Sequence, residues 1–83
     1  MTPLEEAPNL GKVMAQKLKS VGINTLEELK MIGAEQAFLR TRAVDPGACI
    51  SSLLALEGAI QGMRWHDLPP ERKEELKAFK KML

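Results

Sequence analysis

Glycine and proline residues divide this 83-residue chain into short segments, and this spacing restricts the fold more than any other feature of the sequence. The strongest breaks are Gly22, Gly33, the Asp45-Pro46-Gly47 run and the Pro69-Pro70 pair. Between the breaks, apolar residues recur with the period of an amphipathic helix, and no segment alternates polar and apolar residues as a strand does. A chain of this length builds one hydrophobic core. We therefore predict an all-α fold, a single five-helix domain over residues 1–83.

Cap residues mark where the predicted helices begin and end. Thr25, with Glu28 three residues later, is typical of a capping box, and Gly22 stands where a helix C-cap favours glycine. Thr2 and Glu5 predict a similar box around one helical turn at residues 2–7. The five helices are expected over residues 9–21, 25–33, 34–43, 50–63 and 69–83.

The segment over residues 50–63 is apolar around most of its circumference, so we expect it at the centre of the domain. Gly58 and Gly62 leave one line of its surface without side chains, where another helix can approach closely. Trp65 is expected to anchor the last helix to the core. The residues predicted to face inwards are Met14, Ala15, Leu18, Val21, Leu26, Leu29, Ile32, Ala37, Phe38, Thr41, Leu53, Leu54, Leu56, Ile60, Met63, Leu76, Phe79 and Leu83.

Two charged residues lie among apolar positions. Lys17 is expected to lay its stem along apolar surface and to keep its amine in water. Glu57 lies in the most apolar segment and is expected at its rim in an ion pair with Arg64 or Arg40, the alternative being a buried acid.

Composition excludes several classes of function. Twelve Lys and Arg residues against eleven Asp and Glu give a net charge of +1, so no overall attraction to nucleic acid or to an anionic membrane is expected. One cysteine and one histidine are too few for a structural zinc site, which takes about four such ligands. We expect Cys49 to be buried rather than paired with His66 for catalysis. Because no nucleotide-binding, hydrolase or metalloprotease motif is present either, the sequence predicts no enzyme, metal or cofactor.

The sequence is expected to contain neither a membrane span nor a secretion signal. No stretch is apolar over the roughly 20 residues that a membrane span takes, and no basic segment leads into an apolar one as in a secretion signal. We expect a cytoplasmic protein without membrane contact, as a monomer or a weak homodimer.

A candidate nucleic-acid site lies at the run Pro8-Asn9-Leu10-Gly11. The run is typical of a helix-hairpin-helix element, in which a tight turn directs the free N–H groups of a helix start at a phosphate. Asn9 stands where such hairpins commonly have glycine, and Val13 where many have lysine or arginine, which leaves Lys12 as the cation. The alternative is a structural connection with a solvated face. The residues expected to contact DNA or RNA phosphates non-specifically are Asn9, Leu10, Gly11, Lys12, Gln16 and Lys19.

A second candidate site is a basic stripe on the last predicted helix. It is suited to an acidic partner or to phosphates, the alternative being a solvated face beside an acidic one. The basic residues are Lys73, Lys77, Lys80 and Lys81, and the acidic ones are Glu71, Glu74 and Glu75.

Four strings of the sequence, PNLG, AQKL, VGINTLEELKMIGAEQAFLR and LLALEGAIQGMRWHDLPPERKEELK, together resemble the C-terminal domain of the TfoX (Sxy) competence regulators. The resemblance covers nearly the whole chain, and its most specific parts are GI-x-T-L-E-E-L at residues 22–29 and A-L-E-G-A-x-x-G at residues 55–62. It implies a small helical fold related to helix-hairpin-helix (SAM/HhH-like) domains and an association with the regulation of DNA uptake in bacteria. The larger regulators carry this domain after a separate N-terminal domain, whose activity is not assigned to these residues.

These observations favour a non-enzymatic bacterial regulatory module that binds nucleic acid weakly through the hairpin amides and Lys12. The alternative is a protein–protein interaction module that uses the last helix or the face containing Gly58 and Gly62.

Overall fold

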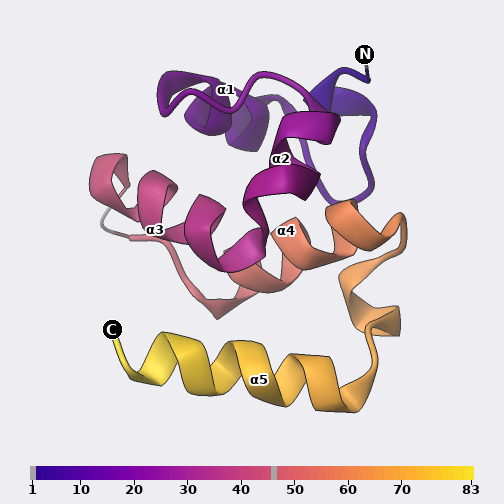
Figure 1. The fold of residues 1–83 in the computed structure, drawn as a ribbon, viewed down its shortest axis with the longest axis vertical. Helices are drawn as coiled ribbons and strands as arrows, with labels where there is room; N and C mark the ends of the chain where they lie inside the picture. Colours follow the sequence, from indigo (N-terminus) through magenta and orange to yellow (C-terminus); the bar gives the residue numbers. More distant parts are fainter. Residues whose placement is uncertain (1, 46) are drawn as a thin grey trace.

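The computed structural model describes residues 2–45 and 47–83, which form five α-helices and two short 3-10 helices (Figure 1). No β-strand occurs in these two ranges, where the one isolated bridge joins Pro3 to Thr25. The all-α prediction with five helices is therefore confirmed. In chain order the elements are η1 (Leu4–Glu6), α1 (Lys12–Ser20), α2 (Leu26–Ile32), α3 (Ala34–Val44), α4 (Ile50–Gln61), η2 (Trp65–Asp67) and α5 (Pro70–Lys81).

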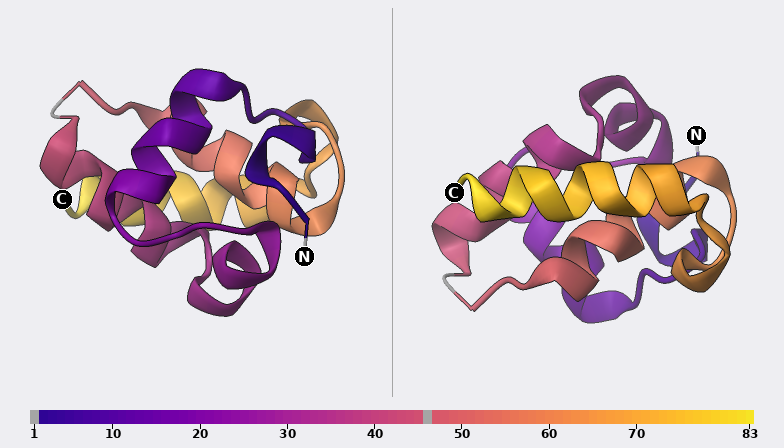
Figure 2. Two further views of the ribbon diagram at one scale, coloured as in Figure 1. Left: turned by 90° about the horizontal axis from the view of Figure 1, so that it is seen from above. Right: turned by 90° about the horizontal axis from the view of Figure 1, so that it is seen from below.

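Helix α4 lies at the centre, as its apolar circumference predicts. Helices α1 and α2 lie on one side of it and α5 on the other, and the view from below shows α5 crossing the underside of the domain (Figures 1 and 2). Leu53, Leu56 and Ala59 of α4 are fully buried. The core that surrounds them is one cluster, to which the other elements contribute Leu4, Ala15, Leu18, Ile23, Leu29, Ala37, Phe38, Leu68 and Leu76.

The first residues do not form the predicted capped turn. Thr2 caps nothing; instead its backbone N–H and its hydroxyl both donate to the Glu27 carboxylate, each at 2.8 Å, while its carbonyl accepts from the N–H of Leu26. The short η1 begins after Pro3, with no side-chain cap. Thr2 was misassigned because its partner lies 25 residues away in the sequence.

Helix α1 begins at Lys12 rather than at Asn9. Asn9 has a φ of 69°, the left-handed conformation of a turn, and Gly11 is the extended N-cap residue. The end of α1 follows the prediction, because Gly22 adopts a φ of 89° and the N–H of Ile23 bonds the carbonyl of Leu18. That pattern is a Schellman motif.

The capping box of α2 forms with a shift of one residue. The N–H of Glu28 donates to Thr25 Oγ1 at 3.2 Å, which confirms Thr25 as the N-cap. The Glu28 carboxylate reaches back to the N–H of Asn24, at 3.0 Å, instead of to that of Thr25. Gly33, with a φ of 88°, then separates α2 from α3.

The Lys17 amine forms an ion pair that the sequence analysis did not predict, while 34% of its side chain stays exposed. Its Nζ donates to Asp45 Oδ2 at 2.5 Å, so the side chain joins α1 to the residue that follows α3. Asp45 also begins the predicted turn, because its other carboxylate oxygen accepts from the N–H of Gly47 at 3.1 Å. Pro46, which the sequence places in this turn, lies outside the described residues.

Helix α4 ends two residues before the predicted Met63. Gly62 takes a left-handed conformation with a φ of 73°, and the N–H of Met63 bonds the carbonyl of Gly58. Gly58 is buried, whereas a Cβ on Gly62 would meet nothing within 4 Å. The two glycines therefore do not form one bare line against another helix, and that prediction was wrong.

Helix α5 begins at Pro70, close to the predicted start, and carries a narrower apolar stripe than expected. Leu76 is fully buried and Phe79 is packed partly against the core. Leu83 lies beyond the end of the helix and is exposed, so its assignment to the stripe was wrong.

Candidate interaction sites

The start of α1 presents free hydrogen-bond donors. Gly11 caps the helix without a side-chain bond, and the first turn contains no acidic residue. Within the described part of the chain, the N–H groups of Lys12, Val13 and Met14 have no acceptor. Lys12 is exposed and makes no ion pair with any described residue. This arrangement is the one that favours an anion at a helix N-terminus.

Asn9, predicted in the same site, has its side-chain amide bonded within the domain. Its Nδ2 donates to the carbonyl of Met63 at 2.9 Å, and its Oδ1 accepts from the N–H of Trp65 at 3.2 Å. Gly58 makes room for these contacts, since a Cβ there would overlap Asn9 Nδ2 and lie 2.8 Å from the Met63 carbonyl oxygen. Asn9 thus joins the N-terminal segment to the loop after α4, and Gly58 is covered from within the domain.

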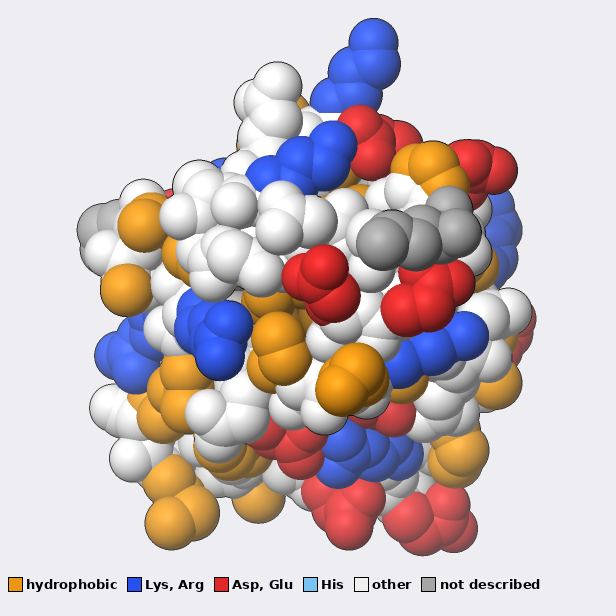
Figure 3. Space-filling model, turned by 45° about the horizontal axis from the view of Figure 1, so that its top comes forward, with side chains coloured by type: hydrophobic (Ala, Val, Ile, Leu, Met, Phe, Trp, Pro, Cys, Tyr) orange, Lys and Arg blue, Asp and Glu red, His pale blue; other side chains and the backbone are white. Residues whose placement is uncertain are grey.

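The other predicted contact residues divide into two groups. Lys12, Gln16 and Lys19 are exposed together on α1, as predicted, whereas Leu10 is buried. Lys19 Nζ pairs with Glu5 Oε2 at 3.1 Å. The pKa of Glu5 is lowered first by backbone hydrogen bonding and then by the hydrogen bond from Lys19. The charge of Lys12 lowers it further. A negative charge therefore stands close to the start of α1, and the surface around α1 and α2 intersperses acidic, basic and hydrophobic side chains (Figure 3).

A groove of about 390 Å³ runs between α5 and the start of α4. Ile50, the first residue of α4, forms its apolar part with Ala78, and three lysines of the predicted basic stripe border it. The fourth, Lys73, does not line it, because its Nζ donates to the carbonyl of His66 at 2.8 Å. The residues that line the groove are Ile50, Glu74, Lys77, Ala78, Lys80 and Lys81.

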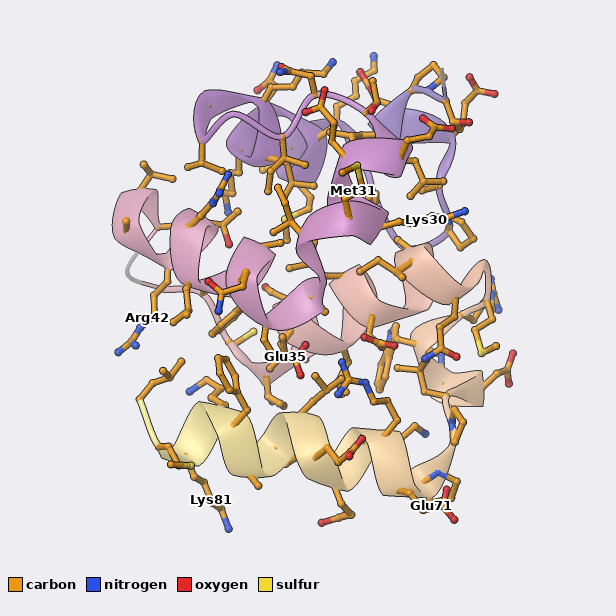
Figure 4. The ribbon with its side chains drawn as sticks, viewed as in Figure 1. Lys30, Met31, Glu35, Arg42, Glu71 and Lys81 are labelled. Atoms are coloured by element: carbon orange, nitrogen blue, oxygen red, sulfur yellow. The ribbon has the colours of Figure 1, made fainter. Side chains whose placement is uncertain are left out.

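A cluster of charged residues that the sequence analysis missed fixes α5 to the rest of the domain. Arg72 of α5 bonds both oxygens of Glu35 on α3, at 2.8 and 3.0 Å, and one oxygen of Glu57 on α4, at 2.8 Å. Figure 4 shows Glu35 pointing from α3 towards α5. Gln61 donates to the other oxygen of Glu57. Glu57 is buried, so its expected place at the rim was wrong, and it forms an ion pair with Arg72 in place of Arg64 or Arg40.

The ionisation of this cluster follows from its contacts. Hydrogen bonds to Glu57 and then to Glu35 raise the pKa of Arg72, and the guanidinium lowers the pKa of Glu35. The cluster has a structural role, since every carboxylate is held by a permanent cation. The sequence signal for this cluster was Glu57, an acid within the most apolar helix, because a buried acid requires a partner.

Cys49 is exposed, so the prediction that it is buried was wrong. It occupies the N-cap position of α4, where the backbone N–H groups of Ser52 and Ser51 lower the pKa of its thiol. His66 stacks on Trp65, with ring centroids 3.8 Å apart, and the Trp65 ring packs partly against the core.

Residues 2–45 and 47–83 contain no group of three or more His, Cys, Asp or Glu side chains placed to hold a metal ion. No helix in the same ranges is long and apolar enough to cross a membrane.

Comparisons with known proteins agree with this architecture. Two crystal structures from Listeria monocytogenes are similar to it, each with a TM-score of 0.90. One, of an uncharacterized protein in a triclinic form, is 53% identical, over 92% of this chain and 86% of that chain. The other, of a protein of unknown function in a tetragonal form, is 50% identical, over 94% of this chain and 96% of that chain.

The sequence comparisons name a family. Protein Sxy of Escherichia coli (strain K12) is 34% identical over 73 residues, which make up 88% of this chain and 35% of Sxy. The chain therefore spans about a third of the length of that relative. Residues 1–80 match the family described as the TfoX C-terminal domain. This chain belongs to the TfoX C-terminal domain family.

Proposed function

We propose that this domain is a non-enzymatic regulatory module of a competence regulator, and that it contacts nucleic-acid phosphates weakly at the start of α1. The family and the similarity to Protein Sxy support the regulatory role. The proposed partner is DNA or RNA, bound without sequence preference.

One observation carries the nucleic-acid contact: at the start of a nine-residue helix, three backbone N–H groups have no acceptor among the described residues, and the lysine beside them has no ion-pair partner there. A phosphate oxygen accepts hydrogen bonds from such groups, and the helix dipole adds a favourable field. The space around Gly11 is open, because a Cβ at this position would meet nothing within 4 Å.

The contact is expected to be weak. Lys19 is already paired with Glu5, which leaves Lys12 as the cation of the site. A site that neutralises one or two phosphates gives a slope of about −1 to −2 when the logarithm of the binding constant is plotted against that of the salt concentration. Binding should therefore be measurable near 50 mM salt and small at physiological ionic strength.

The first prediction tests this site with a charge reversal. Lys12→Glu should abolish binding of mixed-sequence duplex DNA and single-stranded RNA at roughly 50 mM salt, because it places an anion beside the free amides. Fluorescence anisotropy of labelled oligonucleotides over a salt series measures the effect. Folding should be unchanged, since Lys12 is exposed.

Lys30→Glu is the matched control, because Lys30 is an exposed lysine of α2 that makes no ion pair with a described residue. Figure 4 shows it pointing away from the domain. Equal losses in the two variants would indicate diffuse attraction to basic surface, and an absence of binding by the wild-type protein at low salt would exclude the nucleic-acid function.

A second candidate function, protein interaction through the last helix, is favoured by a separate observation. The groove beside α5 combines apolar and cationic side chains in a concave surface. The surface at Gly58, the other interaction face that the sequence predicted, is occupied by Asn9 and the loop at residues 63–65.

A further inference from the structure

We propose that the groove between α5 and the start of α4 is a docking site for an acidic amphipathic segment of another protein. This goes beyond the proposed nucleic-acid contact, from which it differs in place and in the chemistry of the partner. Four of the five lining residues on α5 recur with the helical period, at positions 74, 77, 78 and 81, so one face of the helix forms most of one wall.

The groove offers apolar contacts beside charged ones, and its apolar part consists of Ile50 and Ala78. Ile50 is half-buried and Ala78 is exposed, so an apolar side chain from a partner would bury surface on both. The groove has a volume of about 390 Å³, which is at the lower end of the range of ligand pockets and is enough for one or two large apolar side chains. A lysine-rich helix face that is merely solvated has no such apolar part, so these two residues favour a docking surface.

Charge complementarity selects an acidic partner. Three lysines and a single glutamate border the groove, while the chain as a whole carries a net charge of only +1. Glu74 is held 3.7 Å from Lys77, and within the described residues Lys80 and Lys81 have no ion-pair partner. Figure 4 shows Lys81 extending from the last turn of α5. Carboxylates fit this surface, and a basic segment would be repelled.

The scaffold of the groove is fixed before any partner arrives. Arg72 holds α5 to α3 and α4 two residues before Glu74, and Leu76 is buried in the core between the lining positions. A preformed surface reduces the ordering that binding requires. Helix α5 has 12 residues and is therefore about 18 Å long, so a partner helix of similar length spans it.

The experiment uses a fluorescein-labelled peptide of about 14 residues, matched to the length of α5, with leucine at every third or fourth position and glutamate elsewhere. Its control is the same peptide with lysine in place of glutamate. Anisotropy titrations should show binding of the acidic peptide only, and amide shifts should change around residue 50 and residues 74–81.

The variants locate the site. Ala78→Glu should weaken binding of the acidic peptide about tenfold, since it places a carboxylate that repels the peptide in the apolar part of the groove. Lys81→Glu should weaken this binding about threefold, because it reverses a charge at the rim. Lys30→Glu and Lys12→Glu should leave the affinity within about twofold. Ala78 is exposed, so circular dichroism and the urea midpoint check that the variant folds.

Three results would overturn the docking site. They are no binding of the acidic peptide at millimolar concentration, an unchanged affinity in Ala78→Glu, or amide shifts centred on other elements. Another outcome is that duplex DNA displaces the peptide, and that the domain binds DNA more weakly in Lys81→Glu but not in Lys12→Glu. The lysines of the groove would then belong to a nucleic-acid surface instead. A loss of DNA binding in Lys12→Glu with intact peptide binding separates the two sites.

Discussion

At the scale of single residues, Asn9 and Gly58 depend on each other. Asn9 supplies a left-handed backbone and two side-chain hydrogen bonds, and Gly58 supplies the space in which they form. Asparagine is among the few residues with a side chain that adopt this conformation readily. At position 9 the chain thus uses a side chain to hold a distant loop.

Gly58→Ala should lower the free energy of unfolding by about 1–3 kcal/mol, because the added methyl group overlaps Asn9 and the Met63 carbonyl. Helix propensity alone predicts the opposite sign, a gain of about 0.5–1 kcal/mol. Urea denaturation measures the difference, with Ser51→Ala at an exposed position of α4 as the control. A stabilised Gly58→Ala variant would show that the close approach of Asn9 is not maintained.

At the scale of elements, the ends of the helices were predicted well wherever the signal is local. Gly22, Thr25 and Gly33 act within four residues of their own positions, so the sequence around them contains the whole cause. The partners of Lys17 and Arg72 were not predicted, because Asp45 and Glu35 lie 28 and 37 residues away and no local pattern indicates them. The candidate sites divide in the same way: the α1 face was predictable from helical period, whereas the contribution of Ile50 to the groove depends on how α4 meets α5.

The cap of α2 gives an element-scale prediction. Thr25→Ala should destabilise the domain by about 0.5–2 kcal/mol, because the N–H of Glu28 loses its acceptor, and Thr25→Ser and Thr25→Asn should be nearly neutral. Chemical denaturation of the three variants measures this. Equal losses in all three would assign the threonine a role other than capping.

At the scale of the whole molecule, carboxylates that join distant segments make stability depend on pH. The pKa of Glu27 is lowered from 4.5 to about 2, chiefly by the backbone N–H of Thr2 and then by its hydroxyl. Lys17 lowers the pKa of Asp45, and Arg72 that of Glu35. A group whose pKa is lower in the folded state stabilises the fold above its unfolded pKa, and that stability is lost as the pH falls through the folded value.

Stability should therefore be constant from neutral pH to about 5 and should fall between the ordinary carboxyl pKa and about 2. Glu27→Gln should flatten this fall, measured as the urea midpoint at a series of pH values. Glu71→Gln is the control, because Glu71 is exposed on α5 and its carboxylate makes no bond to another described residue. Identical pH profiles for Glu27→Gln and the wild-type protein would show that the contact with Thr2 is not formed in solution.

The bonds of Asn9 are expected to form late in folding. They close a loop of 54 residues to Met63 and of 56 to Trp65, so they form only after α2, α3 and α4 have brought the two ends together. Closing so long a loop carries an entropic penalty that local helices avoid, which makes such contacts late in folding. The amide hydrogen of Trp65 consequently exchanges with solvent whenever residues 2–10 detach, even while the central helices stay folded.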